Sequence, residues 1–140
     1  MIALLDVNVL VALLVPTHEH HAAARRWVTT TGAADGWATC PLTELGVIRV
    51  CAQLSAGARP PRLTANVLLQ LRVSSPGYCF WPDAMSPATM AEVRQADTAR
   101  QVTDRYLLGL TRRYGGVLLT CDRALALAGG PDAVDLLESQ

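Results

Sequence analysis

The clearest indication of fold class in this chain is the segment Ile2-Ala3-Leu4-Leu5-Asp6-Val7-Asn8-Val9-Leu10. Its opening run, Ile2–Leu5, is apolar throughout, which is typical of a strand buried on both faces of a parallel sheet. The run ends at the acid Asp6, and the residues that follow, Val7–Val15, are predicted to form a helix that Pro16 stops. A buried strand followed directly by a helix predicts an α/β fold.

The same alternation of strand and helix continues along the chain. Strands are predicted at Ile2–Leu5, Trp37–Cys40, Tyr78–Trp81, Val117–Thr120 and Ala133–Leu137. Helices are predicted at Val7–Val15, His18–Thr30, Pro41–Leu54, Thr64–Leu71, Thr89–Ala96, Thr103–Tyr114 and Arg123–Ala128. This order implies an α/β/α sandwich on a mostly parallel sheet, whose ligands bind beyond the carboxyl ends of the strands.

Several details of the connections and helix ends follow from single residues. Pro41 suits the first position of its helix, whose apolar stripe is predicted to be Leu42, Leu45, Ile48 and Ala52. Thr64 is a plausible N-cap for the next helix. Gly32–Gly36 is predicted to be a turn, and Ser55–Pro61 a loop rich in glycine and proline.

Length and composition indicate one compact domain spanning residues 1–140. Of the 140 residues, 51% are apolar and 17% are charged, a balance that suits a packed α/β domain. No apolar run approaches the roughly 18 residues of a membrane span. The N-terminal residues include no basic segment and reach Asp6 at once, so no secretory signal is predicted and a cytoplasmic location is expected.

The usage of lysine, cysteine and histidine excludes several classes of protein. All twelve basic residues are arginine, so enzymes that need a catalytic lysine, such as P-loop NTPases, are excluded. The widely spaced cysteines are predicted to be small buried residues rather than a disulfide framework: Cys40, Cys51, Cys79 and Cys121. A zinc site built from His18, His20, His21 and a cysteine fits no familiar ligand spacing, and helix-start positions are favoured for these histidines.

Four acids are predicted to meet at one edge of the sheet. Asp6 follows the first strand directly, and Asp122 comes two residues after the fourth. Glu44 lies in the first turn of the helix after the second strand, and Asp104 in the first turn of the helix before the fourth. Because carboxylates held close together repel one another, the group favours a hard divalent cation such as Mg²⁺ or Mn²⁺. Such an ion lowers the pKa of a bound water, which can then attack a phosphodiester.

Each of these acids also has a purely structural interpretation. Asp6 would serve as the N-cap of the helix that begins at Val7. Asp104 and Glu44 would complement the dipoles of their helices, and Asp122 would form a surface turn with Arg123. Their joint placement at one end of the sheet is what favours a shared site.

The sequence around the acids resembles the PIN-domain ribonucleases, and among them the VapC toxins of bacterial toxin–antitoxin pairs. Four segments look like the acidic motifs of that family, in its order and spacing: Leu5–Leu10, Thr43–Val50, Thr103–Leu108 and Leu119–Arg123. His21–Trp27 and Phe80–Asp83 also look like VapC segments, so the resemblance covers nearly the whole chain. Cys121 departs from the family, which often has an aromatic or another apolar residue at that position.

The resemblance implies a function and a role for each acid. Asp6 and Asp104 would be the principal ligands of Mg²⁺ or Mn²⁺, and Glu44 and Asp122 would complete the site directly or through water. Polar positions near the site would be held by Asn8 and Thr120, for which hydrogen bonding at a turn or strand end is an equal alternative. The implied activity is endonucleolytic RNA cleavage, with a VapB-type antitoxin as partner and a homodimer as assembly.

The basic and apolar residues suggest where RNA and partners would bind. When the four acids are set aside, the rest of the chain has twelve basic and eight acidic side chains. The surroundings of the acidic centre are therefore predicted to be mildly basic. Arg105 and Arg123, each beside a site acid, are the leading phosphate-binding candidates. Solvated helix faces are the alternative for them and for Arg25, Arg26, Arg49, Arg112 and Arg113. Base stacking is possible for Trp27, Trp37, Trp81 and Tyr106, although core packing is favoured for three of them.

The first helix carries more apolar residues than one buried stripe requires. The surplus over Val7–Val15 predicts burial against a second subunit or an antitoxin.

Other functions are compatible with the same residues. A catalytically silent PIN-like module would bind RNA or protein without cutting, and a phosphodiesterase or DNA nuclease would use the same acids. A phosphatase with Asp6 as nucleophile is disfavoured, because Asn8 stands where an acid is needed and the chain has no lysine.

Overall fold

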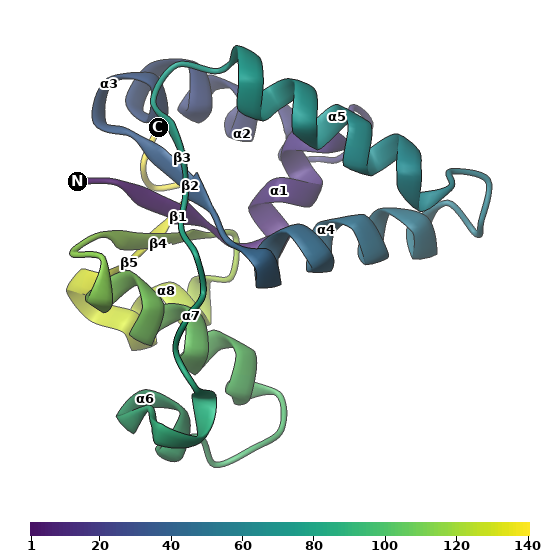
Figure 1. Ribbon diagram of the computed structural model, residues 1–140. Coiled ribbons are helices and arrows are strands. Elements are labelled where there is room, and N and C mark those ends of the chain that lie inside the picture. The colour runs from purple at the N-terminus through teal and green to yellow at the C-terminus, as the bar shows by residue number, and fades with distance from the viewer.

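A computed structural model describes residues 1–140, which form a three-layer α/β structure (Figure 1). The sheet has the order β3-β2-β1-β4-β5, and every neighbouring pair is parallel. Its strands are β1 (Ala3–Leu5), β2 (Trp37–Thr39), β3 (Tyr78–Phe80), β4 (Val117–Thr120) and β5 (Ala133–Asp135). The predicted fold class is therefore confirmed, and the sheet is wholly rather than mostly parallel.

Helices cover both faces of the sheet. They are α1 (Val7–Leu14), α2 (His21–Trp27), α3 (Ala33–Asp35), α4 (Pro41–Leu54), α5 (Pro61–Ser74), α6 (Ala91–Arg94), α7 (Gln101–Arg113) and α8 (Arg123–Gly129). Leu5 and Leu119 join the core beneath α1, α2, α4 and α5, whereas Leu4 and Leu118 join the core beneath α7 and α8. Successive residues of a strand point to opposite faces, so each short strand supplies both cores.

Some predicted helix boundaries were wrong. The helix predicted at His18–Thr30 begins only at His21, because turns precede it, one of them closed by the hydrogen bond from the His18 N–H to the Val15 carbonyl. At its other end the helix continues as a π-helix over Val28–Gly32. The segment predicted as a turn, Gly32–Gly36, contains α3. The helix predicted at Thr89–Ala96 is reduced to the single turn of α6, preceded by a 3-10 turn at Pro87–Thr89.

The predicted N-cap at Thr64 was also wrong. Helix α5 begins three residues earlier at Pro61, with Pro60 as its N-cap, and Thr64 is buried within the helix. Proline is well suited to the first turn because it lacks the N–H that would have no helical partner there.

None of the helices combines the length and the apolar character that a membrane span requires.

Helix α4 begins at Pro41 as predicted, and of its predicted apolar stripe Leu42 and Ile48 are partly buried against the cores, whereas Leu45 was wrong. Its buried residues are small: Thr43, Gly46, Val47 and Cys51, while Leu45 is 68% exposed. A methyl group placed at Gly46 would lie 2.5 Å from Cγ2 of Val7, so only glycine permits α1 and α4 to approach this closely. Close helix packing therefore selected small residues over the larger apolar ones.

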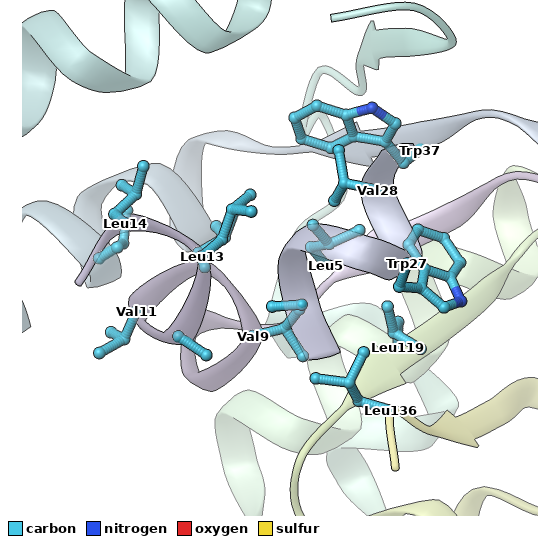
Figure 2. Packing of buried hydrophobic residues seen from close by; sticks show 14 of the residues in the cluster. Leu5, Val9, Val11, Leu13, Leu14, Trp27, Val28, Trp37, Leu119 and Leu136 are labelled. Atoms are coloured by element: carbon cyan, nitrogen blue, oxygen red, sulfur yellow. The ribbon is translucent and has the colours of Figure 1, made fainter. Parts of the chain in front are cut away.

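The apolar surplus of α1 is buried within the chain rather than against a partner. Val9 to Leu14 are all buried, in a cluster that includes Leu5, Trp27, Trp37, Leu119 and Leu136 (Figure 2). The prediction that α1 offers a partner surface was therefore wrong, because α2, α4, α5 and the sheet enclose it. Six of the twelve exposed large apolar residues lie on α4 and α5: Leu45, Leu54, Leu63, Val67, Leu69 and Val73.

Replacing Gly46 with valine tests the packing of α1 on α4. The added side chain would overlap the branched side chain of Val7, which cannot move away freely, so Gly46→Val should destabilise the fold by about 1–3 kcal/mol. Chemical denaturation would measure the change. Ala52→Val, on the same helix at a half-exposed position, adds the same side chain away from α1; it lowers helix propensity, whereas Gly46→Val raises it, so propensity alone would make Gly46→Val the more stable variant. Equal stability of the two variants would contradict the proposed close approach.

Candidate metal-dependent active site

Three aspartates line one cleft at the carboxyl ends of β1 and β4. Asp6 follows β1, Asp122 follows β4, and Asp104 lies in the first turn of α7. Since β1 and β4 are adjacent and parallel, with Leu5 paired to Leu119, the residues that follow them emerge side by side. The cleft has a volume of about 410 Å³, and Asn8, Arg49 and His18 also line it.

Asp6 is the most deeply placed of the three acids. Its side chain is held on both oxygens: Oδ1 accepts from the Val7 N–H at 2.7 Å, and Oδ2 accepts from the Thr120 hydroxyl at 2.8 Å. Burial raises the pKa of Asp6, and these hydrogen bonds oppose the rise only in part. The N-cap interpretation is thus correct for Asp6, and it does not exclude a place in the shared cleft.

Thr120 and Asn8 connect the two strands behind the acids. The Thr120 hydroxyl donates to Asp6 and accepts from the Asn8 side-chain amide at 3.1 Å and from the Asp122 N–H at 3.0 Å. Asn8 Oδ1 accepts from the Cys121 N–H at 2.9 Å. One threonine hydroxyl therefore contacts both Asp6 and the backbone of Asp122.

Asp104 and Asp122 add negative charge around Asp6. Burial raises the pKa of Asp104, and the charges of Asp6 and Asp122 raise it further, while Arg100 opposes the rise. Asp122 is the N-cap of α8, since its Oδ1 accepts from the Ala124 and Leu125 N–H groups at 2.9 and 3.1 Å. The protein thus holds three carboxylates in mutual repulsion, which a bound cation would relieve.

The three aspartates are not arranged as the coordination shell of a metal ion. No group of three or more His, Cys, Asp and Glu side chains lies close enough together to hold a metal ion. Both oxygens of Asp6 and one oxygen of Asp122 are engaged in hydrogen bonds to the protein. Binding of a cation would therefore require the carboxylates to turn toward one another.

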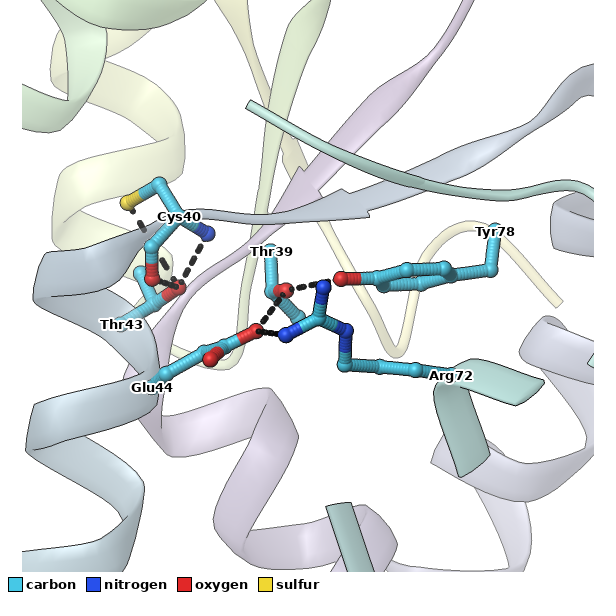
Figure 3. Close-up of polar contacts among 6 residues, drawn as sticks. All are labelled: Thr39, Cys40, Thr43, Glu44, Arg72 and Tyr78. Carbon is cyan, nitrogen blue, oxygen red and sulfur yellow. Dashed lines mark hydrogen bonds and ion pairs between the residues drawn. The ribbon is translucent and has the colours of Figure 1, made fainter. Parts of the chain in front are cut away.

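Glu44, the remaining predicted acid, lies outside this cleft. Its Oε1 accepts from the Thr39 hydroxyl at 2.6 Å and from Arg72 Nη1 at 3.3 Å (Figure 3). Tyr78 is hydrogen-bonded to the same hydroxyl at 2.9 Å, and the Arg72 guanidinium lies over the rings of Tyr78 and Phe80. The structure brings three of the four predicted acids together and pairs Glu44 with a cation instead.

The arginines divide into paired and unpaired groups. Arg112 binds Asp132 at 2.7 Å and Glu92 at 3.2 Å, so its role is structural and its candidacy for phosphate contact was wrong. Arg105 lines a second cleft beside Asp104, and Arg123 lines a pocket that also includes Asp122 and Asn8.

The aromatic residues considered for base stacking are all in the core: Trp27, Trp37, Trp81 and Tyr106.

Two residues that the sequence analysis missed contribute to the surroundings of the acids. Arg100 lies near Asp104, and its spacing of four residues along one helix face was an available signal. Arg72 is the partner of Glu44, and no local pattern could reveal a contact between residues 28 positions apart.

The four cysteines are free, and only Cys40 and Cys51 are fully buried.

Comparison with known proteins shows the family to which this chain belongs. The PIN domain family matches residues 3–130. Ribonuclease VapC39 of Mycobacterium tuberculosis is 42% identical over 142 aligned positions, covering 98% of this chain and 100% of the relative. Ribonuclease VapC29 of the same organism is 40% identical and covers 96% of each chain. This chain belongs to the VapC group of PIN-domain proteins.

Further matches support this assignment to the VapC group. Ribonuclease VapC38 of Mycobacterium tuberculosis is 44% identical over 122 positions, covering 86% of this chain and 84% of the relative. The crystal structure of PAE2754 from Pyrobaculum aerophilum superposes with a TM-score of 0.63 at 18% identity, covering 98% of this chain and 90% of that one. At that identity the likeness shows the fold alone.

The raised pKa of Asp104 predicts how the metal-free protein responds to pH. An acid whose pKa is higher in the folded than in the unfolded state destabilises the fold once it ionises, so stability falls as pH rises above the usual aspartate range. In the presence of EDTA, Asp104→Asn should therefore melt a few degrees higher than the parent at pH 7. The difference should vanish near pH 3, where Asp104 is protonated in both states.

Melting curves across this pH range would check the prediction. Asp35→Asn, at an exposed position on α3, is the matched control and should leave the melting temperature unchanged. A lower melting temperature for Asp104→Asn at pH 7 would show that Asp104 stabilises the helix end instead.

Proposed function

We propose that this protein is a Mg²⁺- or Mn²⁺-dependent endoribonuclease that acts as the toxin of a toxin–antitoxin pair. The observation that carries the proposal is the cleft in which Asp6, Asp104 and Asp122 repel one another at the carboxyl end of the sheet. The similarity to VapC ribonucleases over nearly the whole chain supports RNA as the substrate.

The donor atoms fit the proposed ion. Three carboxylates supply the hard oxygen ligands that Mg²⁺ and Mn²⁺ prefer. Burial raises the pKa of Asp104, and repulsion from Asp6 and Asp122 raises it further; such an ion would offset this repulsion. Asp6, Asp104 and Asp122 would hold it, with Glu44 as a further ligand only if it left Arg72. Once bound, the ion would activate a water and stabilise charge on the leaving oxygen.

The protein's own residues orient the reaction. Thr120 fixes the direction of the Asp6 carboxylate and the backbone of Asp122, and Asn8 holds Thr120 in turn. Arg49 at the edge of the cleft supplies a cation for an RNA phosphate. Attack of water on phosphorus would break the bond to the 3′ oxygen, which takes a proton, leaving a 5′-phosphate and a 3′-hydroxyl.

Metal dependence is the first test of this proposal. The purified protein should cleave RNA with Mg²⁺ or Mn²⁺ and stop in EDTA, and Asp104→Asn should lower the rate by about a hundredfold or more. Mn²⁺ at a hundredfold excess over its Kd should stabilise the parent by about 2.7 kcal/mol and so raise its melting temperature. It should not stabilise Asp104→Asn.

Glu44→Gln is the informative comparison in the same experiment. If Glu44 stays with Arg72, this variant keeps the stabilisation by Mn²⁺ that Asp104→Asn loses. Equal loss in both variants would place Glu44 among the ligands. Undiminished cleavage in excess chelator would contradict the metal mechanism, and Mn²⁺ binding without cleavage of RNA or DNA would indicate a silent binding module.

The proposed partners are a VapB-type antitoxin and a second copy of the chain. Both associations need apolar surface, and α4 and α5 together carry six exposed large apolar residues, with Val73 at 80% exposure. An antitoxin arginine that reached the acids would offset their repulsion by forming a bidentate ion pair with a carboxylate.

Co-expression tests the partner. A small DNA-binding protein encoded beside this chain should co-purify with it and suppress its toxicity, and the double substitution Leu69→Glu with Val73→Glu should weaken that complex. Leu127→Glu, at an exposed position on α8, is the control. Failure of the neighbour to bind or to suppress toxicity would remove the toxin assignment and leave the nuclease proposal standing.

A further inference from the structure

A second cleft adjoins the three acids on the side away from Asp6. It has a volume of about 420 Å³, within the size range of small-molecule sites, and lies between the beginning of α7 and helix α8. Asp104 and Asp122 line both this cleft and the first one, so these two acids form the wall between them.

The second cleft combines unpaired cations with an apolar surface. Arg100 and Arg105 line it, and neither guanidinium takes part in a salt bridge or in a side-chain hydrogen bond, unlike Arg72 and Arg112. Its apolar lining includes the buried side chains of Leu108 and Leu125.

The apolar wall continues on α8 in residues small enough to leave space. Ala124 and Ala128 stand one helical turn apart, both are exposed, and both line the cleft. A flat ring could lie against this aliphatic surface while a guanidinium stacked on it or bound its phosphate, the two modes in which arginine contacts nucleotides.

From this geometry we propose that the α7–α8 cleft binds the nucleoside next to the scissile phosphate. The inference rests on the proposed function, since a phosphate held at Asp104 and Asp122 places the flanking nucleotides in the clefts on either side. The base lies against Ala124, Ala128 and Leu125, and Arg100 and Arg105 bind the adjoining phosphate. RNA therefore crosses the acids from the Arg49 side to the Arg100 side, and this cleft contributes to the choice of cleavage site.

Nucleotide binding can be measured without any cleavage. The probes are the four nucleoside 5′-monophosphates, titrated into nitrogen-15-labelled protein in buffer with Mg²⁺, with ribose 5-phosphate as the probe that lacks a base. At least one nucleotide should shift the backbone amides of Gln101, Arg105, Ala124 and Ala128 saturably. Ribose 5-phosphate should bind there at least about fivefold more weakly, since stacking of a base contributes about 1–3 kcal/mol.

Variants separate the cleft from the rest of the surface. Ala128→Leu fills the cleft and should abolish the shifts, whereas Ala22→Leu, an exposed alanine on α2, should not. Ala124→Leu provides a second filling variant, and a dispersed spectrum shows that each variant is folded. Replacing Arg100 and Arg105 together with alanine should weaken binding at least about fivefold, and Arg62→Ala on the distant α5 should not.

Three results would overturn the inference: no saturable shifts at α7 and α8, equal shifts with ribose 5-phosphate, or unchanged binding in both filling variants. Because none of these measurements uses RNA cleavage, the two proposals fail separately. A protein that bound nucleotides in this cleft but cut no RNA would contradict the ribonuclease proposal and keep the cleft only as a nucleotide-binding site. A protein that cut RNA without binding nucleotides here would contradict only the cleft assignment.

Discussion

The pairing of β1 with β4 is the constraint on which the rest of the site depends. The Asp6 N–H donates to the Leu119 carbonyl at 2.9 Å, which continues the parallel ladder one residue past β1 and fixes the point at which the chain leaves the sheet. The next contact, from the Thr120 hydroxyl to Asp6 at 2.8 Å, then joins residues 114 positions apart. Because both strands run in the same direction, their carboxyl ends and the acids that follow share one edge.

The fold keeps these acids close at an electrostatic cost. Burial disfavours the charged forms of Asp6 and Asp104, and the neighbouring carboxylates add to this effect, so both acids have raised pKa values. The hydrogen bonds of Val7 and Thr120 to Asp6, and the cap that Asp122 forms on α8, offset part of this cost. No salt bridge joins Asp6, Asp104 or Asp122 to a basic side chain, which is the physical basis for proposing a divalent ion in the cleft.

Helix α4 explains why one acid is placed differently from the other three. Gly46, Arg49 and Val50 line the cleft with the aspartates, and the contact of Gly46 with Val7 sets the rotation of the helix about its axis. Glu44 precedes Gly46 by two residues, about 200° around a helix, so it faces the opposite way, toward Thr39 and Arg72. The ion pair with Arg72 and the stacking of that guanidinium on Phe80 stabilise this orientation.

Three features could be predicted from the sequence alone: the alternation of strands and helices, the parallel sheet, and the edge of the sheet at which Asp6, Asp104 and Asp122 lie. These features follow from short apolar runs and from the position of each acid relative to its own strand or helix, which are local properties. Other features depend on how the elements pack: α1 is enclosed, α4 buries Gly46 and Val47 rather than Leu45, and Glu44 pairs with Arg72. Packing also brings Ala124 and Ala128 of α8 to the same cleft as Arg100 and Arg105. Such outcomes depend on the rotation and spacing of packed helices, which distant side chains set through close contact, and no local pattern of residues encodes them.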